Sequence, residues 1–172
     1  KRCRAVVCGN MQQKSEDELL YTSQVDIASI LCAVRLAVVF GWMISAIDVK
    51  AAFLYALLPP ELMICVRPPS VWIQLGLINR GEIWRLRKAL YGLRIAPRLW
   101  GEERDARLRT LRWTIDGCIY CLLQCTVDGC VWLIRLFDES SVHLGVRSPL
   151  IGMLVTYVDD LLILCKQGRV RQ

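Results

Sequence analysis

Two adjacent acidic residues, Asp159 and Asp160, interrupt a run of strand-forming apolar residues that extends from Met153 to Cys165. Val, Ile, Leu and Tyr on both sides predict two buried strands, and the acidic pair between them predicts the tight turn of a β-hairpin. Such a turn lifts both carboxylates out of the core. Because neighbouring carboxylates repel each other, they favour a site with a cation between them or water around them.

A third acidic residue, Asp48, lies alone in the apolar segment from Ile44 to Leu54. Three carboxylates carried by two strands can hold two divalent ions, an arrangement that serves phosphoryl transfer. In that chemistry one ion activates the attacking oxygen and the other stabilises the leaving group. We therefore predict that Asp48, Asp159 and Asp160 form one metal site.

Three motifs follow one another in the chain: Asp48-Val-Lys-Ala-Ala-Phe53-Leu, then Leu86-Arg-Lys-Ala-Leu-Tyr91-Gly-Leu-Arg-Ile-Ala-Pro97-Arg-Leu-Trp100, then Tyr157-Val-Asp-Asp160. With the opening Arg4-Ala-Val-Val-Cys-Gly9, this order resembles the reverse transcriptase of the Ty1/copia class of retrotransposons over almost the whole chain. The resemblance implies an RNA-directed DNA polymerase, a nucleotidyltransferase that is part of a Pol polyprotein. It also implies two Mg²⁺ ions, with Mn²⁺ as an alternative, held by Asp48 and Asp159 with assistance from Asp160.

The fold class that the resemblance implies is α+β. It consists of a polymerase palm, an antiparallel sheet with two helices packed on one face, together with partial fingers. The chain is then a single reverse transcriptase domain over residues 1–172, with fingers mainly in 1–47 and 55–90 and palm mainly in 48–54 and 91–172. The thumb follows the metal-binding hairpin in the family, and we expect it to be absent because the chain ends at Gln172.

The apolar segment from Ile27 to Ile47 has one charge, Arg35, and its length alone would permit a membrane span. Gly41, however, is placed as a helix C-cap, and the segment runs directly into the strand that carries Asp48. We therefore predict a buried helix from about residue 29 to residue 40 followed by a strand, and no membrane partner. A second helix is predicted from Pro97 to about residue 112.

The resemblance also implies residues that bind the incoming nucleotide. A bulky aromatic five residues after the first metal-binding Asp lies under the nucleotide sugar in the family and collides with a 2′-hydroxyl, so Phe53 would select deoxynucleoside triphosphates. The alternative is that Phe53 is a core residue. Tyr91 would lie beneath the template base, where Gly92 permits close backbone approach. The implied nucleotide-binding set is Phe53, Tyr91, Arg2, Arg4 and Arg94.

The second motif alternates basic and aromatic residues, a pattern typical of a surface that holds phosphates and stacks bases. Its candidate nucleic-acid-binding residues are Arg85, Arg87, Lys88 and Arg98, interleaved with Trp84, Tyr91 and Trp100. A net charge of +6, with 17 Arg and 5 Lys, agrees with a polyanionic partner, although an Arg-rich solvated surface is the alternative. The expected partners are an RNA or DNA template with primer, deoxynucleoside triphosphates, and the thumb, RNase H, integrase and protease of a Pol polyprotein.

Four cysteines, Cys118, Cys121, Cys125 and Cys130, lie within thirteen residues, with His143 nearby, so a zinc-binding module is one alternative function. The spacing argues against zinc, because a strand over 118–125 followed by an Asp128-Gly129 hairpin turn would point Cys118 away from Cys121. We predict free thiols instead. Nine cysteines without a signal peptide indicate a reducing compartment, and so an intracellular, not secreted, protein that is cytoplasmic and particle-associated in the family.

Three positions depart from the family pattern. Cys8 stands where Lys or Arg is usual, Ile95 where Gln is usual, and Ala56 where Gly is usual. These departures favour a second alternative, a catalytically inactive relic of a transposon that still binds nucleic acid.

Overall fold

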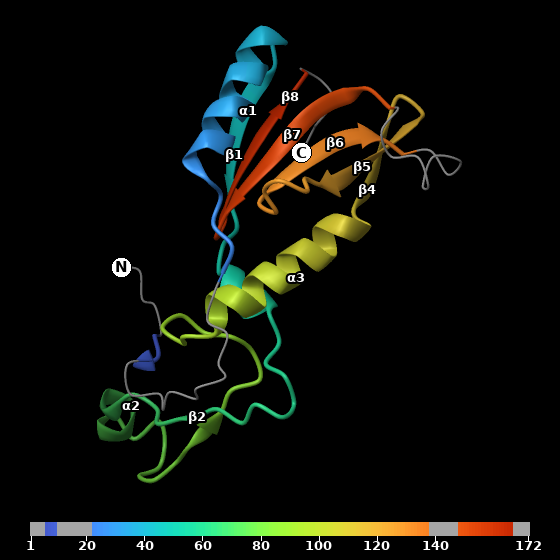
Figure 1. Cartoon of the computed structure of the whole chain (residues 1–172). Coiled ribbons are helices and arrows are strands. Elements are labelled where there is room, and N and C mark those ends of the chain that lie inside the picture. The colour runs from blue at the N-terminus through green and yellow to red at the C-terminus, as the bar shows by residue number, and fades with distance from the viewer. Residues whose placement is uncertain (1–5, 10–21, 138–147, 167–172) are drawn as a thin grey trace. The chain divides into compact units, whose positions relative to one another are not determined.

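The structure is a computed structural model that describes residues 6–9, 22–137 and 148–166 (Figure 1). The chain forms two compact units. The first contains residues 1–21 and 51–100, and the second contains residues 22–50 and 101–172. Residues 22–47, which the sequence-based division gave to the fingers, thus fold together with the segment that contains Asp159 and Asp160.

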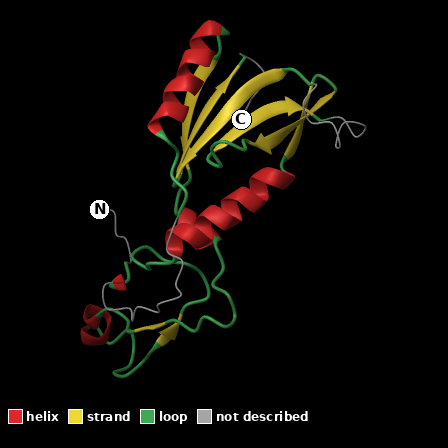
Figure 2. Ribbon diagram, in the orientation of Figure 1, coloured by secondary structure: helices red, strands yellow, loops and turns green. Residues whose placement is uncertain are grey.

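A six-stranded antiparallel sheet forms the second unit (Figure 2). Its spatial order is β1-β8-β7-β6-β5-β4. The strands are β1 (Met43–Asp48), β4 (Arg112–Ile115), β5 (Cys118–Gln124), β6 (Val131–Leu136), β7 (Leu150–Tyr157) and β8 (Asp160–Cys165). Because β1 comes from a distant part of the sequence and pairs with β8, it brings Asp48 into the same sheet as the acidic hairpin.

Helix α1 (Ile27–Val39) confirms the predicted helix, and its ends follow from local sequence. It is buried only along the face of Ala33 and Ala37, whereas Val38 and Val39 are exposed, so the expected burial of the whole helix is wrong. The Asp26 side chain caps the N-terminus by accepting a hydrogen bond from the Ala28 N–H at 2.7 Å. At the C-terminus Gly41 has φ 61°. The Gly41 N–H donates to Val38 and the Trp42 N–H donates to Ala37, which is the Schellman pattern that a glycine permits. The chain then turns directly into β1.

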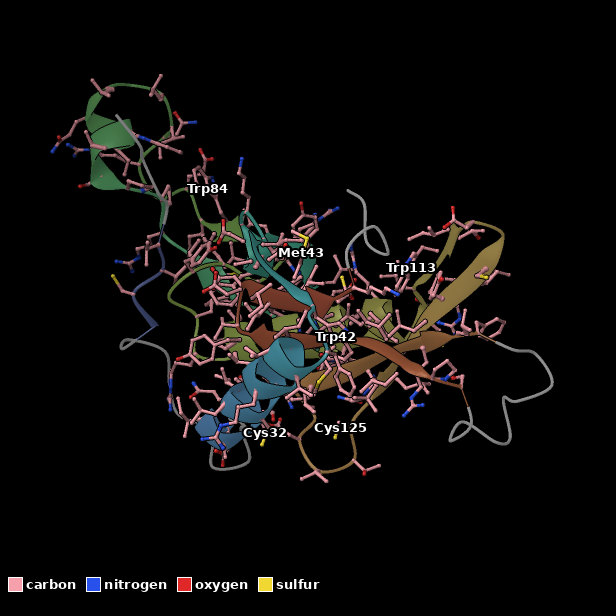
Figure 3. All side chains as sticks on the ribbon, turned by 90° about the horizontal axis from the view of Figure 1, so that it is seen from above. Cys32, Trp42, Met43, Trp84, Trp113 and Cys125 are labelled. Carbon is pink, nitrogen blue, oxygen red and sulfur yellow. The ribbon has the colours of Figure 1, made fainter. Side chains whose placement is uncertain are left out.

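The two helices cover opposite faces of the sheet, so the expectation that both pack on one face is wrong. Alternate residues of the central strands form two cores. One contains Ala33 and Ala37 of α1 with Val131, Met153, Val155 and Leu164, and the partly buried Trp42, labelled in Figure 3, packs against it. The other contains Leu108 of α3 (Ala96–Thr110) with Leu122, Trp132, Ile134 and Leu154. Central strands that are apolar on both faces need cover on both sides.

The first unit is built from short elements. They are the 3₁₀ helix η2 (Ala52–Tyr55), β2 (Cys65–Val66), α2 (Ser70–Gln74) and β3 (Trp84–Arg85). Strands β2 and β3 pair antiparallel. Only two residues of the segment 62–66 are in a strand, and the segment 70–82 begins with a helical turn. Among the described residues, no helix is long and apolar enough to cross a membrane.

The Asp128 carboxylate ties the β5–β6 connection to the start of α1. It accepts hydrogen bonds from the Asp26 N–H at 3.1 Å and the Cys130 N–H at 2.9 Å. Burial alone would raise the Asp128 pKa, but hydrogen bonds from the Ser29 side chain and these two amides outweigh it and hold the pKa below its ordinary value of 3.8. The contribution to stability is therefore fully present above the unfolded pKa and is lost as pH falls through the folded pKa.

We expect Asp128→Ala to lower the free energy of unfolding at neutral pH by about 1–2 kcal/mol, because two backbone donors lose a charged acceptor. The difference from wild type should shrink as pH falls to about 3. Urea unfolding followed by circular dichroism at both pH values measures it. Val127→Ala, in the same connection with a side chain 92% exposed, is the control and should have little effect. A difference that stays constant down to low pH would contradict the assigned role.

Candidate functional site

The turn of the acidic hairpin lies one residue earlier than the sequence suggested. Tyr157 of β7 pairs with Asp160 of β8, so Val158 and Asp159 are the two turn residues and Asp160 begins the strand. The Asp159 side chain is half-buried, whereas Asp160 is exposed. The Asp159 carboxylate is therefore carried by a turn residue, and the Asp160 carboxylate by a strand residue.

Val158 has an unfavourable backbone conformation. Its φ is 51°, while Asp159 keeps a negative φ. A positive φ at the first position alone is the type II′ pattern, which favours glycine at that position. A β-branched residue with positive φ is a genuine outlier, with a cost of about 1–3 kcal/mol. Contacts elsewhere in the unit must hold this turn in place.

The sheet register brings Asp48 to the acidic hairpin. Asp48 is the direct antiparallel partner of Asp160. The next residue, Val49, donates its N–H to the Asp159 carbonyl at 2.9 Å. Directly opposed antiparallel residues share a face, with Cβ atoms about 4.5–5.5 Å apart. Asp48, more than a hundred positions away in sequence, thus lies at the same end of the sheet as Asp159 and Asp160.

The chemistry of these donors fits a divalent cation. Carboxylate oxygens are the hard ligands that Mg²⁺ binds, and like charges placed directly opposite each other destabilise a sheet without a counter-ion. Within residues 6–9, 22–137 and 148–166, no three His, Cys, Asp or Glu side chains gather closely enough to hold a metal ion as they stand. Asp48 and Asp160 are exposed, and exposed side chains change rotamer freely.

One buried cation beside this turn was missed by the sequence analysis. Arg104 of α3 is only 5% exposed. It donates to the Val158 carbonyl at 3.4 Å and to the Asp105 carboxylate at 2.9 Å. The available signal was helical spacing, because Arg104 lies four residues from both Trp100 and Leu108, which are buried.

In the first unit, Phe53 packs against Tyr91. Their ring centroids are 4.6 Å apart and the rings are inclined at 59°. Phe53 is half-buried, so it is neither a fully buried core residue nor a free surface residue. The two implied nucleotide-binding aromatics are therefore brought together, and the Tyr91 ring limits where the Phe53 ring can move.

The opening segment of the chain contacts the backbone at Tyr91 and Gly92. The Val7 N–H donates to the Tyr91 carbonyl at 2.8 Å. A Cβ atom added to Gly92, whose φ is 92°, would lie 1.9 Å from the Val7 carbonyl oxygen, so only glycine fits there. This contact is with the chain's own Val7 backbone, and the approach expected at Gly92, to the template base, stays a prediction. Residues 6–8 form no regular strand, and Arg2 and Arg4 lie outside the described residues.

The basic segment presents three charges to solvent. Arg85, Arg87 and Lys88 are exposed, whereas Arg94 and Arg98 are half-buried. Leu57 forms an isolated antiparallel bridge with Lys88, β3 holds Arg85, and the chain bends at Arg87 between them. The exposed charges of Arg85, Arg87 and Lys88, called the basic face here, suit a phosphate backbone.

The comparison with known families decides the identity. Residues 1–170 match the model of the family described as "Reverse transcriptase (RNA-dependent DNA polymerase)". The chain belongs to this reverse transcriptase family. The resemblance predicted from the three motifs is thereby confirmed.

The chain is also similar to curated proteins. It is 28% identical over 169 residues to the Retrovirus-related Pol polyprotein from transposon TNT 1-94 of Nicotiana tabacum, covering 96% of this chain and 11% of that protein. It is 30% identical over 138 residues to each of the Pol polyproteins from transposons RE2 and RE1 of Arabidopsis thaliana, covering 78% of this chain and 8% of each relative. The chain thus spans about a tenth of these relatives. No solved structure matches it.

Two of the departures from the family pattern lie in the packed interior, since Ala56 and Ile95 are both buried. Among the described cysteines, Cys118 is exposed and Cys121 buried, as predicted for a strand. Burial raises the pKa of the Cys121 thiol, although Arg112 and Arg135 oppose this, and burial raises the pKa of Cys165. Both thiols therefore stay protonated at neutral pH and unreactive. Cys125, labelled in Figure 3, follows β5, and His143 lies outside the described residues.

Proposed function

We propose that this chain catalyses RNA-directed DNA synthesis, in which a primer 3′-hydroxyl attacks the α-phosphate of a deoxynucleoside triphosphate. The single observation that carries the proposal is the register of the sheet, which sets Asp48 opposite Asp160 and beside the Asp159 backbone. Membership of the reverse transcriptase family supports it.

In this proposal Asp48 and Asp159 hold two Mg²⁺ ions, or Mn²⁺ ions, and Asp160 assists. When bound, such ions supply the positive charge that activates the attacking hydroxyl and stabilises the leaving pyrophosphate. The carboxylates themselves fix the place of that charge, because they are attached to a paired strand and a two-residue turn. The exposed position of Asp48 and Asp160 leaves room for substrate on the same face.

We assign the second unit to the palm, because its sheet carries the three carboxylates, and the first unit mainly to the fingers. Phe53, supported by Tyr91, excludes a 2′-hydroxyl, and Arg2, Arg4 and Arg94 offset the charge of the triphosphate. The template sequence is read by base pairing, so the protein needs to recognise only the nucleic-acid backbone and the shape of the duplex.

The proposed partners are an RNA or DNA template with primer, deoxynucleoside triphosphates, and other parts of a Pol polyprotein. Support for the last comes from the names of the relatives, of which this chain spans about a tenth. The eight described cysteines are all free, which suits the reducing interior of a cell.

Primer extension tests the proposal. A DNA primer annealed to a homopolymer RNA template should be extended with the complementary deoxynucleotide in Mg²⁺ or Mn²⁺, and chelation of the ions should stop the reaction. Binding of primer–template without any extension in either ion would contradict the proposal and support the inactive relic.

The basic face gives a separate prediction. Replacing Arg85, Arg87 and Lys88 together by Ala should weaken primer–template binding at low salt about equally for all sequences. The slope of log affinity against log salt should fall by about 2–3, because each residue releases about one counter-ion. Fluorescence anisotropy across a salt series measures both effects. Arg80→Ala, an exposed Arg in the same unit, is the control; an unchanged slope in the triple variant would rule out phosphate contacts by this face.

A further inference from the structure

Arg104 is a buried cation with a defined set of partners. Its Nε and one terminal nitrogen bind the Asp105 carboxylate, at 2.9 Å and 2.8 Å, and its other terminal nitrogen donates to the Val158 carbonyl. A buried charge is costly unless it is paired and hydrogen-bonded. Because this guanidinium is shielded from solvent, its hydrogen bond to the turn is electrostatically stronger than an exposed contact of the same length would be.

The hydrogen bond from Arg104 is accepted within the turn itself. The Val158 carbonyl belongs to the peptide that joins Val158 to Asp159, the middle peptide of the two-residue turn. Type I′ and type II′ turns differ in the orientation of this peptide, and the φ angles here match type II′. A hydrogen bond to the middle carbonyl thus selects one orientation. The same peptide plane sets the direction in which the Asp159 side chain leaves the backbone.

We propose that Arg104 is a positioning residue of the active site, which holds the middle peptide of the Val158-Asp159 turn so that the Asp159 carboxylate faces the metal position. The inference rests on the proposed function for the role of Asp159. Arg104 does not touch substrate or metal in this proposal. Arg104 acts on the Asp159 carboxylate only through its hydrogen bond to the Val158 carbonyl.

A second layer of hydrogen bonds keeps Arg104 in place. Gln124 donates through Nε2 to the second Asp105 oxygen at 3.4 Å and to the Gly129 carbonyl at 2.7 Å. Arg109 donates to the Gln124 Oε1 at 2.8 Å. Asp105 is therefore fixed from the end of β5, and the guanidinium is held between α3 and the turn rather than free to change rotamer.

The test compares Arg104→Met with Arg107→Met. Arg104→Met keeps most of the volume of the buried side chain but removes every hydrogen-bond donor. Arg107→Met changes an exposed Arg of the same helix that pairs with Glu103. Mn²⁺ binding to the 172-residue chain, measured by electron paramagnetic resonance of the free ion, should weaken at least about fivefold in Arg104→Met and stay within about twofold in Arg107→Met. Equal weakening in both, or none in Arg104→Met, would overturn the proposal.

A metal-free readout separates this inference from the proposed function. In ¹H–¹⁵N spectra, the Asp159 amide signal should shift or broaden in Arg104→Met because its own peptide reorients, while the signals of β2 stay unchanged. An unmoved Asp159 signal overturns the positioning role. If wild type binds no Mn²⁺, the proposed metal site fails, and the Asp159 amide still decides whether Arg104 holds the turn.

Arg104→Lys keeps the test valid if Arg104→Met does not fold. Lysine retains the buried charge and can pair with Asp105, but one ammonium lacks the fork that spans a carboxylate and a separate carbonyl. It should therefore fold and show the same weakened Mn²⁺ binding and the same Asp159 shift. Wild-type behaviour of Arg104→Lys in both measurements would show that the guanidinium contact with Val158 is not required.

Discussion

Asp159→Asn is expected to abolish primer extension, with a loss of about a thousandfold or more, while leaving primer–template affinity nearly unchanged. The substitution is isosteric, so it keeps the turn but removes one negative charge from the end of the sheet. Metal binding depends on that charge, whereas nucleic-acid binding depends on phosphate contacts made by basic residues. Single-turnover extension assays and anisotropy measure the two quantities separately.

The register provides an internal control for this result. Asp48 and Asp160 are directly opposed like charges, so loss of a carboxylate here should not destabilise the metal-free fold. Thermal unfolding without metal should therefore give Asp159→Asn a midpoint close to that of wild type. Asp116→Asn, an exposed acidic residue in the β4–β5 turn, should retain full extension. Extension by Asp159→Asn at more than a tenth of the wild-type rate would refute the assigned role.

Phe53→Val is expected to relax sugar selection, so that the ratio of kcat/KM for a deoxynucleotide to that for the matching ribonucleotide falls by about tenfold to a hundredfold. The physical reason is steric. The Phe53 ring rests against the Tyr91 ring at 4.6 Å, so it cannot withdraw easily from a 2′-hydroxyl, whereas the shorter Val leaves space for it. Steady-state extension with each nucleotide on one template measures the ratio.

Phe40→Val is the matched control for this prediction. Phe40 is 56% exposed at the end of α1, so the same substitution there should leave sugar selection unchanged. Tyr91→Leu should produce a smaller relaxation than Phe53→Val, because it removes the support of the Phe53 ring and leaves the ring itself. An active Phe53→Val enzyme with wild-type discrimination would show that Phe53 is a packing residue.

Several features could be predicted from sequence because they depend on nearby residues. The end of α1 follows from Gly41, whose positive φ completes the Schellman hydrogen bonds. The β5–β6 hairpin follows from two strand-like runs joined by residues 125–130, which contain the turn-forming pair Asp128-Gly129. The acidic pair was recognised because charge inside an apolar run is unusual. Each of these signals lies within a few residues of the feature that it specifies.

The tertiary structure decided what depends on pairing between distant segments. Periodicity alone does not tell which face of a sheet a helix covers, and the opposite placement of α1 and α3 appears only when the alternate residues of β6, β7 and β8 are assigned to two cores. The same holds for Arg104. Helical spacing puts it in line with Trp100 and Leu108, but only the fold brings the Val158 carbonyl within reach of its guanidinium. The sequence alone identifies the side chains that could take part in catalysis. The register and packing of the sheet determine which of these side chains lie close together, because hydrogen bonding and burial depend on distance in space and not on distance along the chain.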